Sequence, residues 1–202
     1  MITLINVSQH INGINDQLCR YMSDKLDSSG LEYRYIQTRD LNIAFCNNCR
    51  LCMKPAGNDL GICHINDDMR SLIDSMLSSD VLILSAPVNC YDLPSIIRIL
   101  LERMSVFCHW SDEMRAPKVR DTGRDIKGVL ITTSALPGIM VPLLTKVKKT
   151  YTLFAKPLRI KKTDYYHIGF KGRKQDSSFT DNDRKVVQSI ISTIIKTKRG
   201  AA

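Results

Sequence analysis

The sequence lacks an apolar run long enough to span a membrane, which would take about 20 residues. It also lacks a charged start followed by an apolar stretch and a small-residue cleavage site. Internal repeats and low-complexity segments are missing too. We therefore expect a soluble cytoplasmic protein without a membrane partner. With 202 residues, 44% of them hydrophobic, the chain can bury one sizeable core, so we expect a single domain over residues 1–202.

Aromatic side chains are scarce, at 6% of residues, and the 20 acidic residues are outnumbered by 29 basic ones. A net charge of +9 can attract nucleic acids or anionic nucleotides. The basic residues are spread thinly, however, and concentrate only in "KVKK", "RIKK", "KGRK" and "KTKR" after residue 145. Few rings are present for stacking on bases. We expect a solvated basic surface and do not expect nucleic acid as a partner, since that interpretation rests on charge alone.

Apolar runs and amphipathic stretches alternate along the chain. The run "VLIL" in particular is continuous rather than alternating, which indicates a strand buried on both faces of a parallel sheet. The pattern predicts an α/β doubly wound fold in three layers. Asn15 or Asp16 is expected to cap the first helix, and Thr180 with Asp183 has capping-box spacing at the start of the last one. Strands are predicted at 2–8, 31–37, 81–87, 127–134 and 157–170, and helices at 15–30, 66–80, 94–107, 137–154 and 180–198.

Three polar loops follow predicted strands, at 8–16, 85–94 and 132–138. In open parallel sheets a ligand binds beyond the carboxyl ends of the strands. The first loop precedes a helix N-terminus, where backbone N–H groups can receive a phosphate, although it matches neither G-x-G-x-x-G nor a Walker loop. The second carries Asn89, Cys90 and Tyr91, which can line a flat aromatic ligand. Together the loops predict a nucleotide-like pocket.

Four of the seven cysteines fall within eighteen residues, at Cys46, Cys49, Cys52 and Cys63. In a reducing compartment such a cluster indicates ligands or free thiols rather than a disulfide framework. The first three reproduce the ferredoxin spacing C-x2-C-x2-C, whereas zinc sites more often show two separated pairs. An iron–sulfur cluster, empty thiols and zinc all remain open. We expect the four cysteines to act as one unit beside the ligand pocket.

The residues resemble those of the flavodoxin-like NAD(P)H-dependent FMN reductases and, among these, the iron–sulfur flavoproteins. The resemblance lies in "CNNCRLCMKPAGNDLGICHINDDM", in "SDVLILSAPVNCYDLPSIIRILLERM" and in "NVSQHINGIN". It implies a flavodoxin-like five-stranded sheet of order 2-1-3-4-5 with a cysteine-rich insertion at 45–66. It also implies bound FMN, NAD(P)H as co-substrate, a second small-molecule electron acceptor, and a homodimer or homotetramer.

The resemblance assigns cofactor-binding residues to the three loops and a [4Fe–4S] cluster to the four cysteines. Flavin hydride transfer requires no catalytic acid or base from the protein, and none is assigned. Gln9 and His10 replace the family's Pro-Arg in the phosphate loop, so a non-enzymatic flavodoxin-type carrier or a structural metal-binding module is the alternative. The expected FMN contacts are Ser8, His10, Gly13, Asn15, Pro87, Val88, Asn89, Cys90, Tyr91, Thr133 and Ser134.

Overall fold

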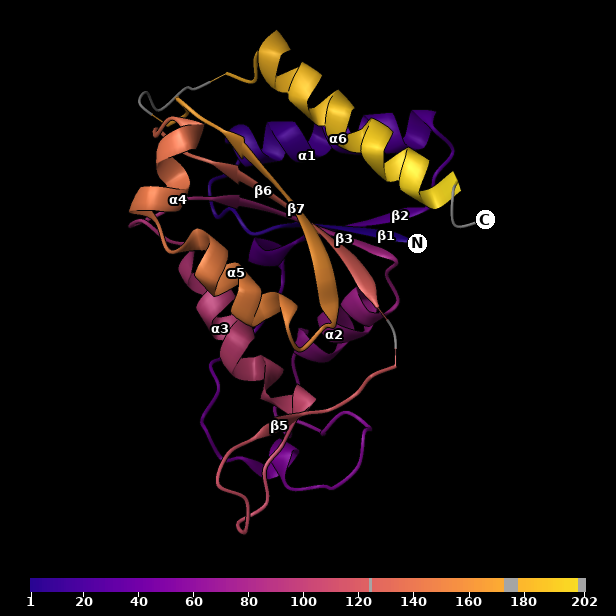
Figure 1. Ribbon diagram of the computed structural model, residues 1–202, viewed down its shortest axis with the longest axis vertical. Helices are drawn as coiled ribbons and strands as arrows, with labels where there is room; N and C mark the ends of the chain where they lie inside the picture. Colours follow the sequence, from indigo (N-terminus) through magenta and orange to yellow (C-terminus); the bar gives the residue numbers. More distant parts are fainter. Residues whose placement is uncertain (124, 173–177, 200–202) are drawn as a thin grey trace.

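The structure is a computed structural model that describes residues 1–123, 125–172 and 178–199. At its centre lies a five-stranded parallel sheet in the order β2-β1-β3-β6-β7 (Figure 1). Counted along the chain these strands are the first to the fifth of the sheet, so the predicted order 2-1-3-4-5 is confirmed. The strands are β1 (Ile2–Asn6), β2 (Tyr33–Gln37), β3 (Val81–Pro87), β6 (Ile126–Thr133) and β7 (Ile160–Ile168).

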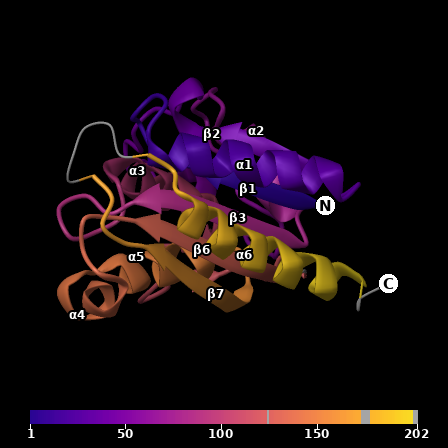
Figure 2. The ribbon, with the colours of Figure 1, turned by 90° about the horizontal axis from the view of Figure 1, so that it is seen from above.

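Helices cover both faces of the sheet and give the three layers that the sequence predicts (Figure 1). On one face, α1 (Ile14–Ser28) and α6 (Asp181–Arg199) lie side by side (Figure 2). The other face is covered by α2 (Met69–Leu77), α3 (Ser95–Arg103) and α5 (Val147–Ala155). Among the described residues, no helix combines the length and the apolar character that crossing a membrane would require.

Alternating residues of the central strands divide the core into two halves. Leu4 and Ile83 pack against α1 and α6, whereas Ile5 and Leu84 pack against the helices of the opposite face. All four side chains are fully buried. Because every residue of the β1 and β3 centres is covered, these strands read as unbroken apolar runs in the sequence.

Several element boundaries differ from those predicted. Gly13 is the residue before α1, so Asn15 and Asp16 lie in the first turn of the helix rather than at its cap. The helix predicted at 137–154 divides into a 3-10 turn (Gly138–Met140), α4 (Val141–Leu144) and α5. It breaks because the Lys146 N–H donates to the Tyr91 carbonyl, 2.8 Å away, instead of to a carbonyl of its own turn. The helix predicted at 94–107 ends at Arg103 and continues as a 3-10 turn (Met104–Phe107).

One local signal is confirmed by hydrogen bonds. Asp183 accepts hydrogen bonds from the Thr180 N–H (2.7 Å) and hydroxyl (2.8 Å), as the capping box predicts.

The charged stretch 112–125 contains β5 (Lys118–Val119), which pairs with β4 (Cys108–His109). Arg120 follows β5 and is buried, because its guanidinium donates to the carbonyls of Pro55 and Gly57 in the cysteine segment.

Candidate functional site

A pocket of about 780 Å³ lies at the carboxyl edge of the sheet, where the loops after β1, β3, β6 and β7 meet. Its size falls within the range of cofactor sites. The pocket contains nine of the expected contacts. The strand order changes direction beside β1, so the loops that follow β1 and β3 diverge there and leave a crevice. Those nine are Ser8, His10, Gly13, Asn15, Pro87, Val88, Asn89, Thr133 and Ser134.

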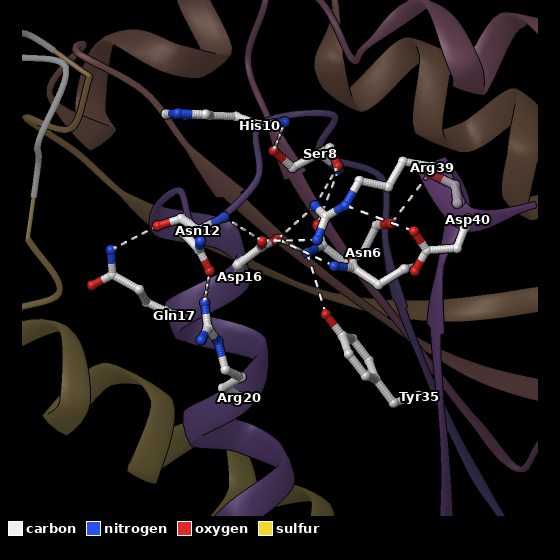
Figure 3. A network of polar contacts seen from close by, with 12 residues as sticks. Asn6, Ser8, His10, Asn12, Asp16, Gln17, Arg20, Tyr35, Arg39 and Asp40 are labelled. Atoms are coloured by element: carbon white, nitrogen blue, oxygen red, sulfur yellow. Dashed lines mark hydrogen bonds and ion pairs between the residues drawn. The ribbon is translucent and has the colours of Figure 1, made fainter.

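A buried ion pair between Asp16 and Arg39 stabilises the first loop (Figure 3). Both guanidinium Nη atoms lie 2.9 Å from carboxylate oxygens of Asp16, and Arg39 also donates to the Ser8 carbonyl. Asp16 in turn accepts from the Asn12 N–H at 2.7 Å and from the Asn6 amide at 2.7 Å. Burial alone would raise the pKa of Asp16, but the hydrogen bonds from Arg39, Asn12 and Gln37 together lower it. The Asp16 carboxylate is therefore ionised. It binds the Asn12 N–H directly, and it holds Arg39, which binds the Ser8 carbonyl.

Asn15, in the first turn of α1, links two strands beneath the pocket. Its amide nitrogen donates to the Thr133 hydroxyl at 2.9 Å, and its oxygen accepts from the Ser85 hydroxyl at 3.0 Å. The residue is 4% exposed. The side chain therefore ties the first loop to the ends of β3 and β6, and the pocket floor is rigid before any ligand arrives.

The second loop contributes Pro87, Val88 and Asn89 to the pocket, whereas Cys90 and Tyr91 lie outside it. Asn89 and Asp92 exchange backbone hydrogen bonds of 2.8 and 2.9 Å across a tight turn. Cys90 and Tyr91 form its corner with positive φ angles of 49° and 63°, a conformation that directs both side chains to solvent. Two expected contacts are therefore absent from the pocket in this structure.

The third loop is supported by a histidine that the sequence did not single out. The Nδ1 of His167 lies 2.9 Å from the Thr132 hydroxyl, and its Nε2 lies 3.2 Å from the Leu136 carbonyl. Burial lowers the pKa of His167, so the ring is neutral at pH 7 and can accept on one nitrogen while donating on the other. Val88 N–H donates to the Thr133 carbonyl at 2.8 Å and joins this loop to the second.

Further lining residues come from the chain after β7, which sequence reasoning did not connect with the site. Lys171, Gly172 and Ser178 border the pocket on the side of α1. The signal available was the basic stretch "KGRK" directly after the last strand, at the same edge as the other loops. The lining residues not anticipated are Gln9, Ile11, Asn12, Ile14, Gln17, Ala135, Lys171, Gly172 and Ser178.

The four clustered cysteines line a second, small cavity of about 20 Å³ and none of them lines the first pocket. Figure 1 shows their segment with β5 at the bottom of the view, beyond the end of α3, while α4 at the rim lies at upper left. α3, nine residues and about 13 Å long, runs between the two places. The thiols and the ligand pocket are thus lined by separate sets of residues.

One polar contact connects the thiol cluster with His64. Cys49 Sγ lies 3.6 Å from His64 Nδ1. Burial, and then the nearby thiols of Cys63, Cys46 and Cys49, raise the pKa of Cys52. Within the part of the chain that the structure describes, no three Cys, His, Asp or Glu side chains converge as ligands of one metal ion.

Arg103, at the end of α3, closes the cysteine segment by holding both of its ends. Its guanidinium donates to the Ala44 carbonyl at 2.9 Å and to Asp67 Oδ1 at 2.9 Å, and it lies 3.7 Å from Cys63 Sγ. The side chains of Arg103 and Asp67 are 1% and 3% exposed. Burial would raise the pKa of Asp67, but hydrogen bonds from Arg103, Ala44 and Met69 lower it, so the pair is ionised.

Comparison with known proteins places these two sites in context. The sequence profile of the NADPH-dependent FMN reductases matches residues 1–121. A protein described as an iron–sulfur flavoprotein from Archaeoglobus fulgidus is 21% identical over 189 residues, which make up 90% of this chain and 89% of the relative.

Solved structures share the fold at low sequence identity. An FMN-dependent NADH-azoreductase from Bacillus anthracis, solved in complex with FMN, is 11% identical with a TM-score of 0.65 over 96% of this chain and 98% of its own. A flavone reductase is 16% identical with a TM-score of 0.60. The match covers 93% of this chain but only 59% of the flavone reductase, so that enzyme carries additional structure.

Proposed function

The chain belongs to the family of NADPH-dependent FMN reductases, and from this premise we propose that the pocket at the carboxyl edge of the sheet binds FMN. The protein is an FMN-dependent NAD(P)H oxidoreductase by family. The observation that carries the proposal is the pocket of about 780 Å³ at the N-terminus of α1, formed by the loops after β1, β3, β6 and β7.

The residues present suit the flavin in charge and shape. Backbone N–H groups of the first turn of α1 lack carbonyl partners within the helix and favour an anion such as a phosphate. Ser8, Gly13 and the Asp16–Arg39 pair fix the loop in front of that turn. A Cβ on Gly13 would come within 2.8 Å of the His10 ring, so only glycine allows His10 to lie over the loop.

Bound FMN would supply hydride and electron transfer, and the protein would position it. Pro87 and Val88 present an apolar wall for a flat ring system, while Asn89 offers an amide to the ring edge. Thr133 and Ser134 contribute hydroxyl groups to the lining. None of these groups has to exchange a proton with the substrate, which agrees with the absence of an assigned catalytic acid or base.

We propose a flat aromatic compound as the electron acceptor. Flavone and azo compounds, named for two structural relatives, are both planar and apolar. Ile11, which lines the pocket, is 65% exposed and offers apolar contact at the entrance. Ile139 and Leu143, 79% and 80% exposed beside the third loop, support the proposal that the chain forms a homodimer or homotetramer.

The first test is cofactor binding and turnover. Purified protein mixed with FMN and passed through a desalting column should retain one flavin per chain and then oxidise NADH or NADPH with a flavone, an azo dye or a quinone. Asn15→Leu, which removes the bridge to Ser85 and Thr133, should weaken FMN binding about tenfold by loosening the pocket floor. Protein that retains no FMN would overturn the proposal. Flavin retention without nicotinamide oxidation would favour the flavodoxin-type carrier instead.

We also propose that Cys46, Cys49, Cys52 and Cys63 hold a [4Fe–4S] cluster. Support comes from the donor set, since four thiols line one cavity, and from the description of the relative from Archaeoglobus fulgidus. A cavity of about 20 Å³ is too small for such a cluster, so the segment has to open when iron binds. The Arg120 contacts to the Pro55 and Gly57 carbonyls would have to adjust when it does so.

Iron content tests the cluster. Protein purified without oxygen, or reconstituted with iron and sulfide, should contain about four irons per chain, because each thiolate holds one corner of such a cluster. Cys49→Ser should lower the iron content sharply, while Cys90→Ser, which changes an exposed thiol outside the segment, should leave it unchanged. Anaerobic protein without iron or broad cluster absorbance would contradict the cluster, and bound zinc would favour a structural metal site.

A further inference from the structure

The side of the pocket that would receive the FMN phosphate has an ammonium group to which the family resemblance assigns no role. Lys171 lines the pocket, and its side chain is only 12% exposed. Its backbone N–H donates to the Ser134 carbonyl at 2.8 Å, which fixes the main chain after β7 against the third loop. The backbone contact and the low exposure together restrict the positions that the Lys171 side chain can take.

Two neighbouring residues link the Lys171 ammonium with the first turn of α1. Its Nζ donates to the Ser178 carbonyl at 3.1 Å, and the next residue, Phe179, donates its N–H to the Gln17 side chain at 3.1 Å. Gln17 belongs to that first turn and also lines the pocket. Two consecutive residues thus connect the ammonium with the helix end that would receive a phosphate.

Asp183 holds the ammonium in this position. Its carboxylate lies 2.5 Å from Lys171 Nζ and is itself fixed by the N–H and hydroxyl of Thr180. A lysine ammonium has three hydrogens, of which Asp183 and the Ser178 carbonyl take two. The third can be given to a ligand without breaking either contact.

We infer that Lys171 makes this chain select a phosphorylated flavin over riboflavin, by donating its third ammonium hydrogen to the FMN phosphate. The inference rests on the proposed FMN site. It also explains why the first loop can have Gln9 and His10 where relatives have proline and arginine. A charge-assisted hydrogen bond to a phosphate contributes enough for about a tenfold difference in affinity.

The test compares the dissociation constants of FMN and riboflavin, measured by quenching of flavin fluorescence. Lys171→Met should weaken FMN binding about tenfold and leave riboflavin binding unchanged, while Lys171→Arg should keep most of the preference. The matched control is Lys161→Met, which removes the same charge from the opposite end of β7, where Lys161 pairs with Asp125 at 2.6 Å. This control should keep the wild-type preference.

Asp183→Asn separates an electrostatic role from a structural one. It removes the competing negative charge while the ammonium stays, so the preference for FMN should be kept or increased. A Lys171→Met protein with the wild-type preference, or equal weakening for both flavins, would overturn the inference alone. A wild-type chain that binds neither flavin would overturn the proposed function together with it.

Discussion

Replacing Asp16 with asparagine is expected to lower the free energy of unfolding by about 3 kcal/mol, because it leaves the Arg39 guanidinium without a counter-charge in a largely buried place. Asp16 is 4% exposed and Arg39 16% at the side chain. The new amide would also turn an N–H group toward either Arg39 or the Asn12 N–H, which now donates to the carboxylate. Since a domain has about 5–15 kcal/mol in all, urea unfolding should show a clearly lower midpoint.

The control for this experiment is Asp74→Asn. Asp74 also accepts from an arginine, Arg70, at 3.1 Å, but both side chains are more than half exposed. Exposed pairs of this kind contribute less than about 1 kcal/mol. Equal losses in the two variants would show that burial of the Asp16 pair is not what stabilises the loop.

At acidic pH, the difference in the free energy of unfolding between the wild-type protein and Asp16→Asn should become smaller. The folded-state pKa of Asp16 lies below its usual value of about 3.9, so its contribution is complete above that value. As the pH falls through the folded pKa, the carboxyl is protonated in both states and the contribution is lost.

The Asp16→Asn variant should also bind FMN more weakly at neutral pH, because Arg39 holds the Ser8 carbonyl and Asp16 holds the Asn12 N–H.

Replacing Arg103 with methionine is expected to release the cysteine segment and to cost about 3–5 kcal/mol, since Asp67 then stays buried without its partner. The Ala44 carbonyl would lose its donor in the same change. Cys52, 9% exposed in the wild-type protein, should then react with a thiol reagent much faster. FMN affinity should change little, because the flavin pocket does not include Arg103.

Arg98→Met provides the comparison within the same helix. Arg98 lies in α3 as well and pairs with Glu102, but its side chain is 73% exposed. Its loss should leave the rate of thiol reaction unchanged and the free energy of unfolding within about 0.5 kcal/mol of the wild-type value. Slow thiol reaction in Arg103→Met would mean that Arg120, which donates to Pro55 and Gly57, holds the segment by itself.

The sequence was sufficient for features that depend on neighbouring residues. β3 was predicted with its bounds because "VLILSAP" is apolar throughout, and the capping box depends on two residues three positions apart. The pocket loops were found for a similar reason: each follows a strand whose end is visible in the hydrophobic pattern. The order of the strands came from the family resemblance and not from the pattern.

Features that depend on distant parts of the chain were missed. Arg39 and Asp16 are 23 positions apart, and Arg120 reaches carbonyls more than 60 positions away. Residue types do not encode such partners. Cys90 and Tyr91 were misplaced because nothing in a cysteine or tyrosine signals a left-handed backbone, which is disfavoured for both. Lys171 was missed because its place depends on how the chain continues after the last strand.

The length of α3 has an evolutionary consequence. Groups separated by more than about 10 Å and sharing no partners contribute to stability almost independently. The residues that line the pocket at the sheet edge and those that line the thiol cavity do not overlap, and α3 runs between the two places. Natural variation can therefore remove the cysteines without disturbing the pocket loops, or alter the loops without disturbing the cysteines. The cysteine segment can thus be gained or lost as a module attached to a scaffold that remains an oxidoreductase.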